Sequence, residues 1–346
     1  MRILIIGGTR FIGPRVASQL HDRGHQIAVF HRGQTADAGL PDAVNHIYGD
    51  RRDLRGFFSH FKNLAPEIVV DMICYNALEA SDLVNTFRGV ADRLVVASSM
   101  DVYRAYGCLL NLESCEPQSV ALDEDSPLRE SRFPYRAQAK NSDDMTYEYD
   151  KIPVEQVVMN NKDLPATILR LPAVYGPGDH RLFDHLKRMD DGRRAILLDE
   201  NHAQWRWTRG FVGNVAAAIA LAAEDPNAAG RVYNVGEPDA LTEAEWVRSI
   251  GRAAGWKGDI VEFPGESLPE HLVAPYDFAH HLNATTNRLR DELGYHEQVS
   301  REDAIKQTVD WERAHPPAFI DIQRFNYELE DAALETMGEW DAGNLC

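Results

Sequence analysis

Residues 2–13 read Arg-Ile-Leu-Ile-Ile-Gly-Gly-Thr-Arg-Phe-Ile-Gly. The apolar run at positions 3–6 is typical of a parallel strand buried on both faces. Glycines at 7 and 8 let the backbone turn tightly beneath a pyrophosphate, and Gly13 lets the next helix pack close to the strand. The free N–H groups of that helix's first turn would then face the phosphates. The stretch therefore predicts a dinucleotide-binding turn.

The spacing of this turn departs from the ordinary dinucleotide fingerprint. The outer glycines, Gly7 and Gly13, are six positions apart rather than five, and Arg10 stands where a middle glycine would be. A strand, a glycine turn and a helix could also be purely structural, so the chemistry has to be sought further along the chain.

Composition narrows the class of protein. The chain has 346 residues, 44% of them hydrophobic and 26% charged, with a net charge of −18. Such an acidic balance argues against a broad phosphate-binding surface, so no nucleic-acid partner is expected. No apolar run is long enough to span a membrane, and no signal peptide opens the sequence, so we expect a cytoplasmic protein without a membrane partner.

The four cysteines, at positions 74, 108, 115 and 346, form no CxxC pair and no metal-ligand spacing. No metal site is therefore expected. Cys108 and Cys115 could approach each other in a loop, but free thiols are favoured in a cytosolic chain.

Apolar runs at 26–30, 68–70, 94–97 and 167–171 alternate with helical patterns such as 80–90. This alternation predicts an α/β fold, a Rossmann-type doubly wound parallel sheet with a smaller C-terminal α/β substrate domain. We assign residues 1–178 to the dinucleotide-binding domain, with 211–235 returning to it, and 179–316 mainly to the substrate domain. Residues 104–145 form a poorly periodic insertion. The acidic tail at 317–346 could pack on the body, serve an oligomer contact or be disordered.

Three polar residues suggest proton and hydride chemistry. Ser99 ends a predicted buried strand, and Tyr147 and Lys151 are four residues apart, which places them on one face of a helix beginning near Ser142. A neighbouring ammonium makes the phenol a better proton acceptor, so Tyr147 would exchange a proton while hydride moves to or from a nicotinamide. Pro153 should bend this helix.

Two other tyrosines are set aside. Tyr149 has Pro153, not a lysine, four residues on, and Tyr135 precedes Lys140 by five positions in a loop-like segment. Neither tyrosine shares a helical face with a lysine as Tyr147 does.

Taken in order, these motifs resemble those of the extended short-chain dehydrogenase/reductases, which include NAD(P)-dependent epimerases and dehydratases. The resemblance covers roughly residues 1–316 and includes Leu-Arg-Leu-Pro-Ala-Val-Tyr-Gly-Pro-Gly at 169–178. It implies that Ser99, Tyr147 and Lys151 are catalytic, that Asp50 contacts the adenine and that the protein is a homodimer, through the helix bearing Tyr147 and the helix near 80–90. The cofactor-binding residues expected from the motifs are Gly7, Thr9, Arg10, Phe11, Ile12, Gly13, His31, Arg32, Asp50, Arg51, Pro172, Ala173 and Val174.

Two departures from the family pattern bear on the ligands. Many NAD-using relatives carry an acid after the second strand, but this chain has His31 and Arg32 there, with Arg10 opposite; the arginines favour NADP over NAD. Ala173 replaces an asparagine typical of nucleotide-sugar epimerases. The expected substrate contacts are Ser99, Asp101, Arg206 and Arg209. The two arginines lie only close to the usual sequence position of a diphosphate-binding arginine.

The sequence thus predicts an NAD(P)-dependent epimerase/dehydratase-family oxidoreductase acting on a sugar-like secondary alcohol or ketone, with a nucleotide-sugar as one option. One alternative is an NADP-dependent reductase of a small carbonyl compound. Another is a non-catalytic member that senses the cofactor or binds RNA, because the glycine turn also resembles that of chloroplast stem-loop RNA-binding proteins.

Overall fold

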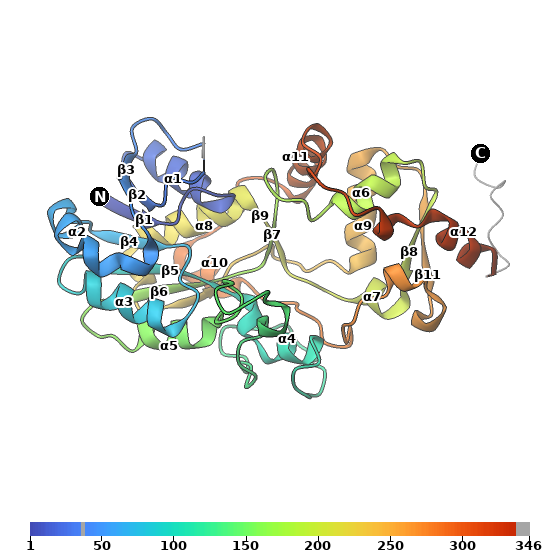
Figure 1. Cartoon of the computed structure of the whole chain (residues 1–346), viewed down its shortest axis with the longest axis horizontal. Coiled ribbons are helices and arrows are strands. Elements are labelled where there is room, and N and C mark those ends of the chain that lie inside the picture. The colour runs from blue at the N-terminus through green and yellow to red at the C-terminus, as the bar shows by residue number, and fades with distance from the viewer. Residues whose placement is uncertain (36–38, 337–346) are drawn as a thin grey trace.

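The computed structural model describes residues 1–35 and 39–336 and consists of two halves lying side by side along the longest axis (Figure 1). The first half is built on a seven-stranded parallel sheet in the order β10-β6-β5-β4-β1-β2-β3. Its strands are β1 (Arg2–Ile6), β2 (Gln26–His31), β3 (Asn45–Tyr48), β4 (Ile68–Asp71), β5 (Arg93–Ser99), β6 (Ala166–Leu171) and β10 (Val232–Asn234). The chain starts at β1 and winds outward in both directions, which confirms the predicted doubly wound sheet.

Helices cover both faces of this sheet because its strands are apolar on both sides. Ile3 and Ile5 of β1 pack in one core with α1 (Ile12–Asp22) and α8 (Val212–Glu224). Leu4 and Ile6 face the other core, with α2 (Phe58–Leu64), α3 (Ala77–Phe87) and α5 (Lys151–Met159). Because successive side chains of β1 enter opposite cores and are all buried from Ile3 on, the strand reads as a continuous apolar run.

The second half contains a two-stranded parallel sheet of β8 (Ala195–Asp199) and β11 (Asp259–Phe263). Its helices are α6 (Phe183–Asp190), α7 (Glu200–Gln204), α9 (Glu243–Ala254), α11 (Arg301–Ala314) and α12 (Tyr327–Thr336). A parallel pair, β7 (Ala173–Tyr175) with β9 (Arg209–Phe211), lies between the two halves, as Figure 1 shows. The chain then returns to the first half through α8 and β10, and α10 (Asn287–Leu293) lies beside β10.

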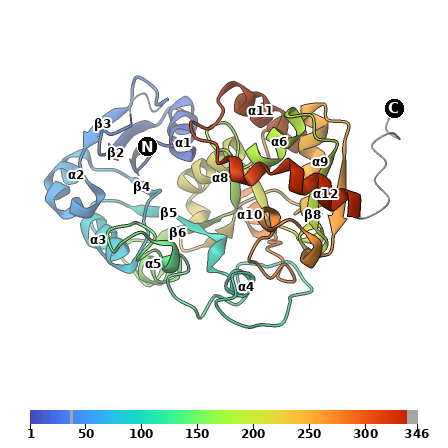
Figure 2. The ribbon, with the colours of Figure 1, turned by 45° about the vertical axis from the view of Figure 1, so that its right-hand side comes forward.

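The described part of the acidic C-terminal segment packs on the second half (Figure 2), where Leu334 of α12 joins an apolar cluster with Leu197 of β8 and Phe263 of β11. Arg188 on α6 pairs with the buried Glu330 of α12 at 2.9 Å. The last ten residues of the chain lie outside the described residues. Within the described ranges, no helix combines the length and apolarity needed to cross a bilayer.

The insertion after β5 contains α4 (Arg104–Leu109) and a loop tied back to it by a disulfide between Cys108 and Cys115. The prediction of free thiols is therefore wrong for this pair, because the seven-residue spacing folds back on itself after α4. Cys74 is a buried free thiol, and Cys346 lies outside the described residues.

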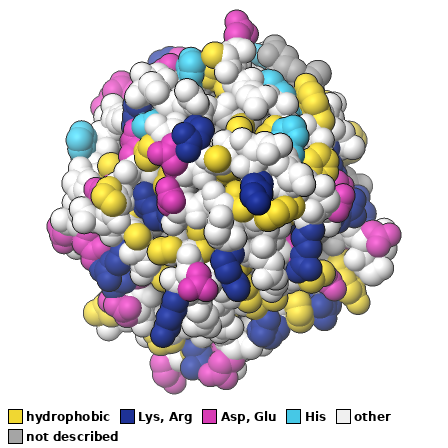
Figure 3. All heavy atoms as spheres, turned by 90° about the vertical axis from the view of Figure 1, so that its left-hand side faces the viewer, with side chains coloured by type: hydrophobic (Ala, Val, Ile, Leu, Met, Phe, Trp, Pro, Cys, Tyr) yellow, Lys and Arg dark blue, Asp and Glu magenta, His cyan; other side chains and the backbone are white. Residues whose placement is uncertain are grey.

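Figure 3 views the end of the molecule formed by the first half, where basic and acidic side chains are interspersed rather than gathered by sign. This face therefore lacks the single basic patch that tracks a nucleic-acid backbone.

Candidate active site

The glycine turn between β1 and α1 is shaped by close backbone contact. Gly7 has a φ of +91°, a conformation that favours glycine, and its N–H donates to the Phe30 carbonyl at 3.0 Å. A Cβ added at Gly13 would lie only 2.4 Å from the Gly8 Cα. The absence of side chains at these positions brings the start of α1 directly against the strand end.

The N-terminus of α1 has the features of a phosphate site. Phe11 occupies the N-cap position with a φ of 42° and makes no side-chain capping hydrogen bond. In the first turn of this eleven-residue helix, Gly13 donates its N–H to the Arg10 carbonyl at 3.0 Å and Pro14 has no N–H, which leaves the N–H of Ile12 without a capping side chain. The N–H of Ile12 at this helix start and the close approach of the glycine backbone fit the diphosphate of a dinucleotide.

The end of β2 carries the residues expected near the adenosine ribose. Arg10 and Arg32 are exposed, and His31 is half-buried, with its Nε2 2.9 Å from Nδ1 of His46. Burial lowers the pKa of His31, and the neighbouring His46 adds to this shift. His31 therefore favours the neutral form, and the arginines supply the positive charge on this side of the turn.

Asp50 and Arg51 follow β3. Asp50 accepts hydrogen bonds from the side chain and backbone N–H of Arg52, which lower its pKa. Arg51 is buried and donates to Asp71 at 2.7 Å. The expected cofactor contact of Arg51 does not fit this placement, since its charge is already neutralised inside the protein.

Lys151 lies buried at the carboxyl edge of the sheet. Its Nζ donates to the carbonyl of Cys74 at 2.7 Å and to that of Ala97 at 2.8 Å. Burial lowers the pKa of this ammonium, opposed by nearby acidic groups. An ammonium has three N–H donors, so one is left for a ligand or a phenol.

Helix α5 begins at Lys151 rather than near Ser142, so the expected helical pairing of Tyr147 with Lys151 is wrong. The Asp150 side chain caps the helix by accepting from the Ile152 N–H, and Pro153 falls in the first turn. Proline costs nothing there, because first-turn N–H groups have no helical partner. The expected bend at Pro153 is absent for the same reason.

Tyr147 instead lies in a turn outside the helix. Its carbonyl accepts from Nε of Arg136 at 2.9 Å, and the Arg136 guanidinium lies 4.7 Å from its ring centroid. Among the described residues, no hydrogen bond connects its hydroxyl to Ser99 or Lys151. The structure thus does not bring the three predicted catalytic residues together.

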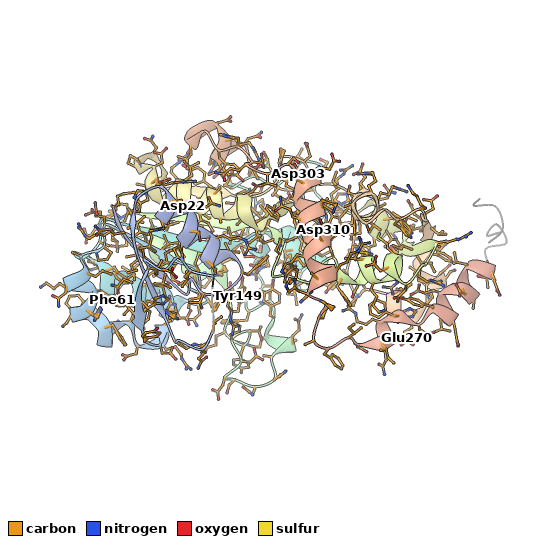
Figure 4. The ribbon with its side chains drawn as sticks, turned by 90° about the horizontal axis from the view of Figure 1, so that it is seen from above. Asp22, Phe61, Tyr149, Glu270, Asp303 and Asp310 are labelled. Carbon is orange, nitrogen blue, oxygen red and sulfur yellow. A yellow bond between two sulfur atoms is a disulfide. The ribbon has the colours of Figure 1, made fainter. Side chains whose placement is uncertain are left out.

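A different tyrosine occupies the site. Tyr149, labelled in Figure 4 near the middle of the molecule, donates its hydroxyl proton to Oδ2 of Asp101 at 2.8 Å. Its ring centroid lies 5.7 Å from Nζ of Lys151, and the nearby Ser99 Oγ accepts from the N–H of Asp101 at 3.2 Å. Ser99 ends β5 at the cleft, whereas the adjacent Ser98 is buried and bonded to Glu155.

Sequence reasoning missed Tyr149 because it required a lysine four residues on. The position of Pro153 was the available signal. Proline is tolerated in a helix only in the first turn, so Pro153 indicates a helix that begins near Lys151. Tyr149 then lies on the extended segment that precedes the helix.

A cavity of about 280 Å³ opens between the halves, lined mainly by aromatic and apolar side chains. Trp205 and Trp207 both line this cavity, and their ring centroids lie 5.3 Å apart. Arg209 also lines it but is ion-paired with the buried Glu243. Arg206, expected at the substrate, instead donates to the carbonyl of Ala240.

The strand order, the glycine turn and the bare start of α1 define a dinucleotide-binding α/β protein. A family model described as the NAD dependent epimerase/dehydratase family matches residues 3–236. The chain belongs to this family and is an oxidoreductase of the epimerase/dehydratase type, which supports a nicotinamide cofactor.

Individual relatives are distant. The 2'-dehydrokanamycin reductase of Streptomyces kanamyceticus is 26% identical over 281 residues, covering 79% of this chain and 72% of that protein. The UDP-glucose 4-epimerase of Streptomyces lividans is 25% identical over 348 residues, covering 92% and 98%. A solved UDP-glucose 4-epimerase of Thermus thermophilus, in complex with NAD, matches with a TM-score of 0.65 at 23% identity, covering 91% of this chain and all of that chain, and shows the shared fold.

Proposed function

We propose that this protein transfers a hydride between a nicotinamide dinucleotide and a sugar-like secondary alcohol or ketone. The observation that carries this proposal is the buried Lys151 ammonium at the carboxyl edge of the sheet, which donates to the Ala97 carbonyl of the strand that Ser99 ends and lies 5.7 Å from the ring centroid of Tyr149. Ligands of open α/β sheets bind at this edge.

The residues of the site have distinct roles in this proposal. The glycine turn and the first turn of α1 bind the diphosphate, and the remaining N–H of Lys151 holds a ribose hydroxyl near the nicotinamide. When bound, the cofactor supplies or accepts the hydride. Ser99 donates a hydrogen bond to the substrate oxygen, and a phenol beside it carries the accompanying proton. Residues 172–174, which follow the carboxyl end of β6, would hold the nicotinamide on one side.

NADP is the proposed cofactor, because Arg10 and Arg32 are exposed on the side of the turn where the adenosine ribose would lie. Their planar guanidinium groups match the geometry of a 2′-phosphate.

The substrate is proposed to be carbohydrate-like but free of a diphosphate. The pocket offers aromatic surfaces on which a sugar ring or other flat group can pack, while Arg209 is neutralised by Glu243 and Arg181 lies 3.3 Å from Asp179. The same pocket favours a second candidate, an NADP-dependent reductase of a small, mostly apolar carbonyl compound, since nothing in its aromatic wall requires hydroxyl groups.

The test uses NADPH deuterated at C4 of the nicotinamide, incubated with the protein and a mixed extract of small metabolites. Mass spectrometry of the extract is expected to reveal a deuterated alcohol. A parallel arm supplies UDP-glucose with NAD and follows UDP-galactose, the product of an epimerase that consumes no cofactor. The proposal would be contradicted if folded protein showed no deuterium transfer and no epimerisation.

A further inference from the structure

The segment that carries Tyr149 is held in place by its neighbour, Asp150. The Asp150 N–H donates to the Tyr75 carbonyl at 2.9 Å, and its fully buried carboxylate accepts from the Phe133 N–H and lies 3.6 Å from Arg129. These contacts tie the segment of Tyr149 to the loops that carry Tyr75 and Phe133. Next to this anchor, Tyr149, Asp101, Tyr135 and Tyr106 form a cluster.

Asp101 is the centre of this cluster. It lies in the short turn after β5, is 5% exposed, and its Oδ2 accepts from Tyr149 at 2.8 Å and from Tyr135 at 2.9 Å. Its other oxygen, Oδ1, is buried and has no hydrogen-bond partner among the described residues. A buried carboxylate oxygen without a donor is costly, so a ligand hydroxyl is the natural partner for it.

The cluster reaches the aromatic pocket. The Tyr135 hydroxyl lies 3.0 Å from that of Tyr106, and Tyr106 lines the pocket. Since Tyr135 gives its single proton to the carboxylate, Tyr106 donates to Tyr135. A continuous line of hydrogen-bonding groups therefore runs from the pocket wall through Tyr135 and Asp101 to Tyr149.

We propose that Tyr149, not Tyr147, exchanges the proton with the substrate oxygen, and that Asp101 is the positioning residue that holds it. The inference rests on the proposed function and names the phenol of that site. Tyr149 has Ser99, Asp101 and Lys151 as its surroundings, whereas Tyr147 is engaged by Arg136.

In the direction of ketone reduction, the carbonyl carbon would accept a hydride with its electron pair from the bound nicotinamide, and the C=O π pair would move to oxygen. The O–H bond of Tyr149 breaks and the O–H bond of the alcohol forms. The phenolate that remains is stabilised by the charge of Lys151, whose Nζ lies 5.7 Å from the ring centroid, and it regains a proton from water.

Tyr149 holds its proton more tightly than a free phenol does. Burial raises its pKa well above the ordinary value, the Asp101 carboxylate adds to the rise, and the hydrogen bond from Ser99 opposes it. Tyr149 therefore stays protonated before the carbonyl group reacts.

The experiment compares Tyr149→Phe with the matched control Tyr147→Phe, using the deuterated NADPH and metabolite extract described above. We expect Tyr149→Phe to bind NADPH like the wild type but to lose at least about 100-fold in the rate of deuterium transfer. Tyr147→Phe should stay within about two-fold of the wild type. Loss in Tyr147→Phe with retention in Tyr149→Phe would overturn the inference.

A second readout does not depend on turnover. Tyrosinate absorbance is followed against pH in the wild type, Asp101→Asn and the double variant Asp101→Asn/Tyr149→Phe. Removing the carboxylate should move the titrations of Tyr149 and Tyr135, which both donate to it, to lower pH, and the one that belongs to Tyr149 should vanish in the double variant. An unchanged titration in Asp101→Asn would refute the cluster. A wild type that moves no hydride but shows this shift would place the failure in the proposed function instead.

Discussion

Replacing Gly13 with alanine is expected to weaken cofactor binding, because the added Cβ would collide with the backbone of Gly8. The new Cβ would lie 2.4 Å from the Cα and 2.6 Å from the carbonyl carbon of Gly8, whereas ordinary contacts start at 3.4 Å. Helix α1 and the glycine turn must therefore separate by about 1 Å, and this overpacking costs roughly 1–3 kcal/mol of stability.

The same shift moves the first turn of α1 away from the diphosphate. Loss of a single hydrogen bond to a charged phosphate costs about 1.5–3 kcal/mol. The dissociation constant for NADPH should therefore rise roughly tenfold to a hundredfold.

Gly24→Ala provides the matched control at the other end of α1. A Cβ there has nothing within 4 Å, but the φ of +85° costs an L-residue roughly 1–2 kcal/mol. Both variants should lose similar stability by thermal melting, yet only Gly13→Ala should lose affinity in a fluorescence titration with NADPH. Equal NADPH affinity in the two variants would refute the role given to the turn.

Three further predictions concern other parts of the chain. Arg10→Ala or Arg32→Ala should weaken NADPH binding roughly tenfold, because a charged hydrogen bond to the 2′-phosphate is lost, and should change NADH binding by less than about two-fold in the same titration. Equal losses of affinity for both cofactors would count against the 2′-phosphate assignment. Burial, with nearby carboxylates adding to it, raises the pKa of Glu312 from 4.5 to about 8, so the folded state keeps a proton that the unfolded state has released. The free energy of unfolding should therefore fall as pH rises from about 4.5 to about 8, and Glu312→Gln should flatten this fall by roughly 1–2 kcal/mol in urea titrations; an identical pH profile in the variant would show that another group governs it. Cys108→Ser should lower the free energy of unfolding by about 2 kcal/mol under oxidising conditions and by much less in reductant, since its bond to Cys115 closes a short loop; equal stability without reductant would contradict a formed disulfide.

The sheet and the glycine turn were predictable because both follow from local patterns. Apolar runs such as 3–6 are buried on both faces, and the requirement for glycine at 13 is a backbone contact made within a few residues. The start of α5 was not predicted, because residues around Ser142 offered a credible cap, while the Asp150 that caps α5 is held by Arg129 and Tyr75, which are far away in sequence.

The phenol cluster was hidden for the same reason. Asp101, Tyr135 and Tyr149 come from three separate loops, and only the tertiary fold brings their polar atoms within 3 Å. The spacing of Tyr147 and Lys151 favours Tyr147 only if both residues lie on one helix. The helix begins at Lys151, after both Tyr147 and Tyr149, and the spacing alone does not reveal this. The neutralisation of Arg51 by Asp71 is likewise a long-range effect.

The central claim is that a nicotinamide dinucleotide binds at the glycine turn of this chain. Calorimetric titration of NADPH, NADH and ATP into the full-length protein tests it most directly. The account predicts saturable binding of one NADPH per chain, tighter than that of NADH, with ATP far weaker than either because it lacks the nicotinamide half. Folded protein that binds neither NADPH nor NADH would contradict it.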